Sequence, residues 1–156
     1  MTIVACSGHR PPKIGGYVLP NPTYNSICLQ TENILKELQP EYCITGMCIG
    51  YDFWFANVCN FLNIPYLAAI PFEGQENLWS NKDKIIYKKL LAKAKDVVMV
   101  STGSYAPNKM QIRNEYLVDN SDILLACFNG QQNGGTYNCI NYAKSKNKQI
   151  TYIDLK

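Results

Sequence analysis

The sequence lacks the two common phosphate-binding fingerprints. No G-x-G-x-x-G follows its first apolar run, and no G-x-x-x-x-G-K-[ST] occurs anywhere in its 156 residues. It also has no C-x-x-C pair, and its seven cysteines are odd in number and irregularly spaced. This pattern argues against both a disulfide framework and a zinc site. We therefore expect reduced cysteines, and we assign no metal and no cofactor.

Charge and long apolar runs are also scarce. Charged residues make up 17% of the chain and the net charge is +3, with the densest lysines in residues 81–95. That cluster is typical of the solvated face of an amphipathic helix, so nucleic acid is disfavoured as a partner. No apolar segment approaches the length of a membrane span, and no basic N-terminal region precedes a long apolar one. The sequence predicts a cytoplasmic protein without a membrane partner.

What is present is a regular alternation of short apolar runs and longer segments of helical period. The runs cover residues 2–7, 42–47, 66–72, 97–102, 123–128 and 149–155, and the helical segments cover about 23–38, 51–62, 82–95, 109–120 and 136–146. Several runs are apolar at nearly every position, as strands buried on both faces are. The pattern predicts an α/β fold, with a Rossmann-like, doubly wound, mainly parallel sheet and helices on both faces. Because no linker or repeat interrupts it, we expect one domain over residues 1–156.

The residues after each predicted strand are rich in glycine and polar groups. In a doubly wound sheet, ligands bind beyond the carboxyl ends of the strands. We therefore expect the loops at residues 7–17, 45–52, 71–79, 101–114 and 129–136 to converge on one crevice. The candidate ligand-binding residues are Ser7, Gly8, His9, Arg10, Thr45, Gly46, Met47, Asp52, Pro71, Gln75, Trp79, Tyr105, Arg113, Asn114, Gly134, Gly135 and Thr136. No catalytic residue is assigned.

The Gly134-Gly135-Thr136 stretch lies where the last predicted helix begins. Free backbone N–H groups and the positive end of the helix dipole favour a phosphate there, and glycines let it approach the main chain. As an isolated stretch, a simple turn with a Thr136 cap is the commoner explanation. The sequence leaves both interpretations, a phosphate site and a simple capped turn, open.

Three charged or titratable side chains have similar alternatives. His9 is the only histidine and stands beside Arg10, so it can contact phosphate or pack in the loop. Arg113 follows Met110 by three residues on one helix face and can point to the crevice with it. Asp52 begins a helix, where capping is favoured over a contact to ribose hydroxyls or a role as general base.

For the aromatic candidates and Gln75, ligand binding and packing in the protein are the two alternatives. Gln75 and Trp79 can hydrogen-bond and stack on a base, whereas Trp54 is expected in the core. Tyr105 can line the pocket or pack, and the sequence does not distinguish the two.

Taken together, the loops "SGHRPPKIGGY", "TGMCIGYDFWFA", "IPFEGQENLW", "YAPNKMQIRNEYLVDNSD" and "NGGTYNCINYA" resemble the YpsA branch of the SLOG superfamily. That superfamily of Rossmann-like domains also contains the Lonely Guy phosphoribohydrolases and the DNA-processing protein of natural transformation. The resemblance implies a nucleotide or nucleotide-derived ligand between the first-strand loop, the second-strand loop and the Gly-Gly-Thr turn. It also implies a homodimer or higher homo-oligomer.

The resemblance includes one departure that bears on activity. Lonely Guy enzymes use an arginine, for which Arg113 is the counterpart, and a glutamate shortly after their glycine-threonine turn, where this chain has Cys139. A neutral thiol cannot replace a carboxylate in activating water. We therefore expect a sensor or sequestering protein that binds a nucleotide or nucleotide-derived signalling molecule without turnover.

Two other functions remain as alternatives to binding without turnover. The first is an N-glycoside hydrolase acting on nucleoside monophosphates, whose carboxylate comes from Asp52, Glu73 or Glu115. The second is single-stranded DNA binding, by resemblance to the DNA-processing protein, which the modest charge disfavours.

Overall fold

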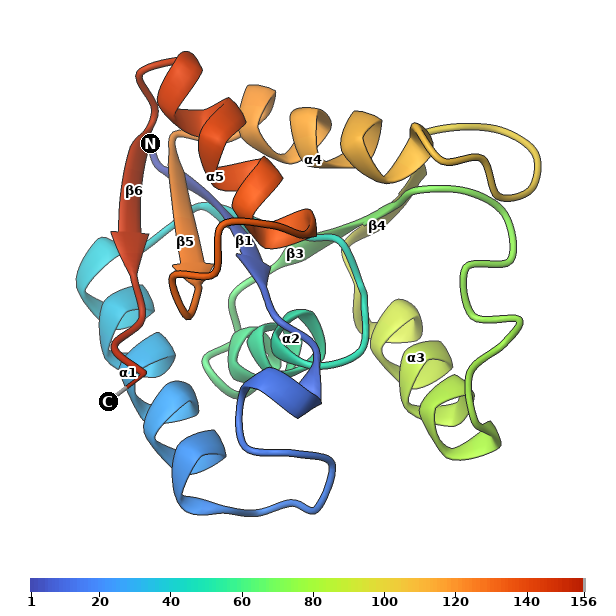
Figure 1. Cartoon of the computed structure of the whole chain (residues 1–156). Helices are drawn as coiled ribbons and strands as arrows, with labels where there is room; N and C mark the ends of the chain where they lie inside the picture. The colour runs from blue at the N-terminus through green and yellow to red at the C-terminus, as the bar shows by residue number, and fades with distance from the viewer. Residues whose placement is uncertain (156) are drawn as a thin grey trace.

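The computed structural model describes residues 1–155, and its centre is a six-stranded sheet with strands paired in parallel in the order β4-β3-β2-β1-β5-β6 (Figure 1). The strands are β1 Ile3–Gly8, β2 Tyr42–Thr45, β3 Tyr66–Ile70, β4 Asp96–Met99, β5 Ile123–Cys127 and β6 Gln149–Tyr152. The helices are α1 Pro22–Leu38, α2 Tyr51–Phe61, α3 Asn81–Lys93, α4 Lys109–Asp119 and α5 Gly135–Ser145, with a short 3-10 turn at Pro11–Lys13. The predicted doubly wound α/β fold is confirmed.

Burial explains why the central strands read as continuous apolar runs. All five residues of β5 are buried, and β1 is buried at its four inner positions. These two strands are neighbours, with Ala5 opposite Leu124 and Ser7 opposite Ala126. The edge strand β4 is largely exposed instead. A strand covered on both faces needs apolar side chains on both.

Helices cover the two faces of the sheet and divide the core in two (Figure 1). One core joins α1, α2 and α3 to the face that carries Val4 and Cys6, and the other joins α4 and α5 to the face that carries Ala5. This alternation follows from the period of two along a strand.

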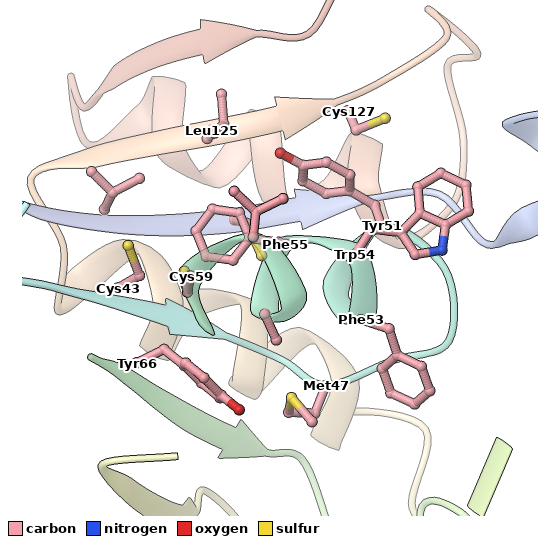
Figure 2. Packing of buried hydrophobic residues seen from close by; sticks show 14 of the residues in the cluster. Cys43, Met47, Tyr51, Phe53, Trp54, Phe55, Cys59, Tyr66, Leu125 and Cys127 are labelled. Atoms are coloured by element: carbon pink, nitrogen blue, oxygen red, sulfur yellow. The ribbon is translucent and has the colours of Figure 1, made fainter. Parts of the chain in front are cut away.

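Figure 2 shows the first core, where Tyr51, Phe55 and Cys59 of α2 pack against the strands that carry Cys43 and Cys127. Cys6, Cys43 and Cys127 are fully buried in this structure, as small apolar core residues are.

The strand order reverses between β1 and β5. From β1 the chain builds outward through β2, β3 and β4, and it then returns to add β5 and β6 on the other side of β1. The loops after β1 and β5 therefore lead to helices on opposite faces, which opens a crevice beyond the carboxyl ends of these strands. Within residues 1–155, no helix is long and apolar enough to cross a membrane.

Candidate ligand-binding site

A pocket of about 340 Å³ lies at this reversal point. Its walls are the loop after β1, the beginning of α2, one face of α4 and the first turn of α5. The lining residues are Cys6, Ser7, Gly8, His9, Arg10, Pro12, Lys13, Cys48, Asp52, Met110, Arg113, Asn114, Leu117, Asn133, Gly134, Gly135 and Thr136. The reversal in strand order thus coincides with a pocket that many of the candidate residues line.

The first turn of α5 presents its backbone to the pocket. Gly134, the N-cap, has φ of 92°, a value that favours glycine, and no side chain caps the helix. A Cβ added at Gly134 or Gly135 would meet nothing within 4 Å. Asn114 of α4 donates from Nδ2 to the Gly135 carbonyl at 3.2 Å and ties the turn to the neighbouring helix. The turn therefore offers uncapped N–H groups and open space, which together suit an anion.

Arg113 lies at the base of the pocket with its side chain buried. Its Nη1 donates to the Gly46 carbonyl at 2.6 Å and its Nη2 to Cys48 Sγ at 3.6 Å. Nε is buried and has no acceptor among residues 1–155. Burial alone would lower the pKa of Arg113, but the negative charges that Cys48 and Asp52 can carry raise it above its ordinary value. A cation whose Nε has no hydrogen-bond partner among the described residues is thus held on the pocket wall.

Gly46 makes this position of Arg113 possible. A Cβ added at Gly46 would overlap the guanidinium of Arg113, so any larger residue would displace it. Gly46 itself lies behind the pocket wall rather than on it.

Asp52 stands in the first turn of α2 and also lines the pocket. Its Oδ2 accepts from the Cys48 backbone N–H at 3.1 Å, and its Oδ1 accepts weakly from Cys6 Sγ at 3.7 Å. Burial raises the pKa of Asp52, and the nearby Arg113 charge opposes that shift. The carboxyl group therefore holds the β2–α2 loop together and remains on the pocket surface as well.

Thr45 and Met47 support this loop from behind. The Thr45 hydroxyl donates to the Asp52 carbonyl at 3.3 Å and accepts from the Met47 N–H at 3.3 Å. Met47 has φ of 58°, which ends the extended backbone of β2 two residues after Thr45.

His9 connects the loops after β1 and β5. Its Nε2 lies 3.0 Å from both the backbone N and Oδ1 of Asn129, two contacts that require opposite protonation states. Burial first, and the Lys13 charge second, lower the pKa of His9. The neutral ring, accepting from the Asn129 N–H, is therefore the form we assign. This bond holds the two loops of the reversal point together.

The structure brings ten of the sequence-predicted residues to one pocket. They are Ser7, Gly8, His9, Arg10, Asp52, Arg113, Asn114, Gly134, Gly135 and Thr136. Thr45, Gly46 and Met47 lie directly behind it, in contact with Asp52 or Arg113.

The remaining four predicted residues, all from the loops after β3 and β4, do not line the pocket either: Pro71, Gln75, Trp79 and Tyr105. Trp79 packs edge-on against Phe53 and Tyr87, with ring centroids 5.8 and 5.2 Å apart. Tyr105 is 64% exposed. The loop after β3 therefore contributes no lining residue to this pocket.

Sequence reasoning missed several lining residues, among them Lys13 and Cys48. Both belong to loops that the sequence singled out, at residues 7–17 and 45–52. The position after a strand could therefore have identified these loops from the sequence. The sequence did not show which side chain of each loop faces the pocket.

The loops of this site match a known family. A model described as the YspA SLOG family matches residues 4–156. This chain belongs to the YspA SLOG family. Membership confirms the resemblance drawn from the post-strand loops. Within this SLOG chain, the matched region includes every residue of the pocket.

The chain is also similar to a bacterial protein from a prophage. It is 34% identical over 129 residues to an uncharacterized SPbeta prophage-derived protein, YoqJ, of Bacillus subtilis (strain 168), covering 72% of this chain and 74% of the relative.

Two solved structures share the fold. DNA processing protein A from Helicobacter pylori, described as binding single-stranded DNA, has a TM-score of 0.69 at 12% identity, with 97% of this chain and 64% of that chain covered. The molybdenum cofactor binding protein of Rippkaea orientalis has a TM-score of 0.62 at 15% identity, with 97% and 75% covered. At such identities the likeness shows the fold alone.

Proposed function

We propose that the pocket binds a nucleotide or a nucleotide-derived signalling molecule through a phosphate group, without turnover. The observation that carries the proposal is the Arg113 Nε, a buried donor without an acceptor among residues 1–155, on the same pocket as the uncapped first turn of α5. A guanidinium and a helix N-terminus are both suited to phosphate oxygens. Two independent features thus favour the same kind of ligand group.

The remaining pocket surface fits this ligand class. Arg10, Lys13 and Arg113 line it against a single carboxyl group, that of Asp52, so an anionic ligand is favoured. Asp52 can accept from a ribose hydroxyl. A volume of about 340 Å³ lies at the lower end of the range of about 300 to 1,000 Å³ that small-molecule pockets occupy.

The environment of Cys139 supports binding without turnover. Cys139 is fully buried, and burial raises its pKa to about 11. The thiol is therefore neutral near pH 7 and does not face the pocket. It cannot perform the work of the glutamate that Lonely Guy enzymes have at this position.

The hydrolase alternative is supported by one observation. Of the three carboxylates considered, Asp52, Glu73 and Glu115, only Asp52 lines the pocket, and its raised pKa is common among catalytic acids and bases. Asp52→Asn keeps an acceptor for the Cys48 N–H. If the protein hydrolyses nucleoside monophosphates, chromatography will detect released base from the parent and a loss of at least about a hundredfold in the variant. Absence of base release from the parent would reject this alternative.

The test of binding begins with native mass spectrometry of the purified protein, which can identify a co-purified nucleotide. Calorimetry with that nucleotide then compares the parent with Arg113→Ala. Loss of a charge-assisted contact of about 1.5 to 3 kcal/mol should weaken affinity about ten- to a hundredfold. Unchanged affinity would refute the phosphate site.

Because Arg113 also supports the Gly46 carbonyl, a second variant is needed. Gly135→Val places a branched side chain in the open space of the α5 turn and should weaken binding at least as much. Asn138→Val, one turn later on an exposed position of α5 outside the pocket, is the matched control and should bind as the parent does.

The homo-oligomer expected from the family resemblance also stays a prediction. Sedimentation equilibrium checks it, since a mass equal to one chain would contradict it.

A further inference from the structure

Cys48 differs from the other cysteines of the chain. Five of the seven are buried, and only Cys28 and Cys48 are partly exposed. Cys48 lines the ligand pocket, whereas Cys28 lies in a shallow groove between α1 and α2. Burial raises the pKa of the Cys28 thiol, and no cationic side chain lines its groove. The two thiols therefore share partial exposure but differ in chemical surroundings.

Two side chains hold the Cys48 sulfur in place. Arg113 Nη2 donates to Sγ at 3.6 Å, and the thiol donates to Gln75 Oε1 at 3.8 Å. Gln75 is itself fixed, because its Nε2 donates to the Met47 carbonyl at 3.3 Å and to the Tyr87 hydroxyl at 3.2 Å. Gln75 is thus a positioning residue behind Cys48 rather than a lining residue of the pocket.

The Arg113 guanidinium gives the Cys48 site its chemistry. A neighbouring cation stabilises a thiolate, and the thiolate is the nucleophilic form of cysteine. Arg113 is buried, its pKa is raised, and it keeps an unpartnered Nε donor beside the same pocket. Its positive charge therefore lies beside the Cys48 sulfur in the wall of the pocket that small polar molecules can enter.

We propose that Cys48 is a modification site for hydroperoxides, and that its oxidation controls access of the anionic ligand to the pocket. After the thiol has released its proton to solvent, the thiolate attacks one oxygen of hydrogen peroxide. An S–O bond forms and the O–O bond breaks, so the sulfur loses two electrons and the peroxide gains them. The departing hydroxide takes up a proton and leaves as water, and Cys48 becomes a sulfenic acid.

The position of Cys48 beside Arg113 connects its oxidation to ligand binding. The new sulfenic oxygen lies next to the Arg113 guanidinium, where it competes with a phosphate for the same donors. This coupling rests on the proposed nucleotide binding, whereas the reactivity of Cys48 does not. The two can therefore fail separately.

The reactivity is tested on the full reduced chain without nucleotide. The protein is treated with hydrogen peroxide in the presence of dimedone, which traps sulfenic acids, and peptide mass spectrometry follows Cys48 and Cys28 in the same sample. We expect Cys48 to be labelled about tenfold faster than Cys28, because only Cys48 has a guanidinium neighbour. Labelling of Cys48 no faster than Cys28 would overturn the proposal, and this comparison needs no variant.

A second measurement tests the role of Arg113. In Arg113→Gln the rate at Cys48 should fall to that of Cys28, and in Arg113→Lys, which keeps the charge, it should be partly restored. An unchanged rate in a folded Arg113→Gln variant would overturn the assigned cause.

Coupling is tested with adenosine 5′-monophosphate as the probe. If calorimetry detects binding, saturating nucleotide should slow labelling of Cys48 and leave that of Cys28 unchanged. Equal labelling with and without bound nucleotide would overturn the coupling. An inert Cys48 in a protein that binds the nucleotide would refute the modification site and leave the proposed function intact.

Discussion

The two sides of the carboxyl edge of the sheet look alike in sequence and differ in the structure. Beyond β1 and β5, the loops enclose a pocket of about 340 Å³. Beyond β3, the equally glycine-rich and polar loop at residues 71–79 is filled, since Trp79 packs on Phe53 and Tyr87, and Gln75 is hydrogen-bonded into the wall. The reversal of strand order at β1 and β5 is the cause, because it separates the following helices.

Glycines show the same contrast at the level of single atoms. A Cβ added at Gly135 would meet nothing within 4 Å, whereas one added at Gly8 would lie 2.5 Å from the Cβ of Tyr51. Both glycines line the same pocket. The space beside Gly135 is open, whereas Gly8 allows the close packing of α2 against β1.

The largest effect is expected from Gly8→Ala. Tyr51 is fully buried, and its hydroxyl lies 2.9 Å from the Thr31 hydroxyl, so the ring cannot move aside easily. Overpacking should lower the free energy of unfolding by about 1 to 3 kcal/mol. Gly135→Ala is the matched control and should leave stability nearly unchanged, because its backbone has no positive φ and its Cβ has room. Urea denaturation measures the free energy of unfolding of both variants. Equal losses in the two would contradict the contrast between a packed Gly8 and an open Gly135.

A comparable effect on stability, without overpacking of the core, is expected at the filled side. Trp79→Leu removes two edge-on aromatic pairs and should lower the free energy of unfolding by about 0.5 to 1.5 kcal/mol for each. Nucleotide affinity, measured by calorimetry, should not change because Trp79 does not line the pocket. A tenfold loss of affinity in a folded variant would show instead that a base stacks on Trp79.

The smallest expected effect is the pH dependence that His9 contributes at the open side. Its pKa is lowered in the folded protein, chiefly by burial, so the unfolded chain binds the proton more tightly. Stability due to the neutral ring is present above about pH 6.5 and is lost as the pH falls from there toward the lower folded pKa.

His9→Gln tests this contribution, because the chain has no other histidine. Urea denaturation from about pH 8 to about pH 5 should show a smaller decline for the variant than for the parent. Identical pH profiles would mean that the His9 bond to Asn129 does not depend on the neutral ring.

Much of the fold was predictable because its signals are local. The buried run at residues 123–128 became β5 Ile123–Cys127, and the helical segment at 136–146 became α5 Gly135–Ser145. Where a predicted strand extends beyond the observed one, a local cause can explain the difference. The strand expected to reach residue 72 ends at Ile70, because Pro71 has no N–H to donate to the sheet.

The sequence by itself determined which segments follow the strands, since this depends only on the order of elements along the chain. That order was enough to include Arg113, Gly134 and Gly135 in the candidate site. Only the tertiary structure decided which loops stay open and which side chains meet. Cys48 and Arg113 are 65 residues apart and come into contact because α4 returns over the sheet beside the β2–α2 loop. Such contacts depend on strand order and helix packing, and no local pattern encodes either.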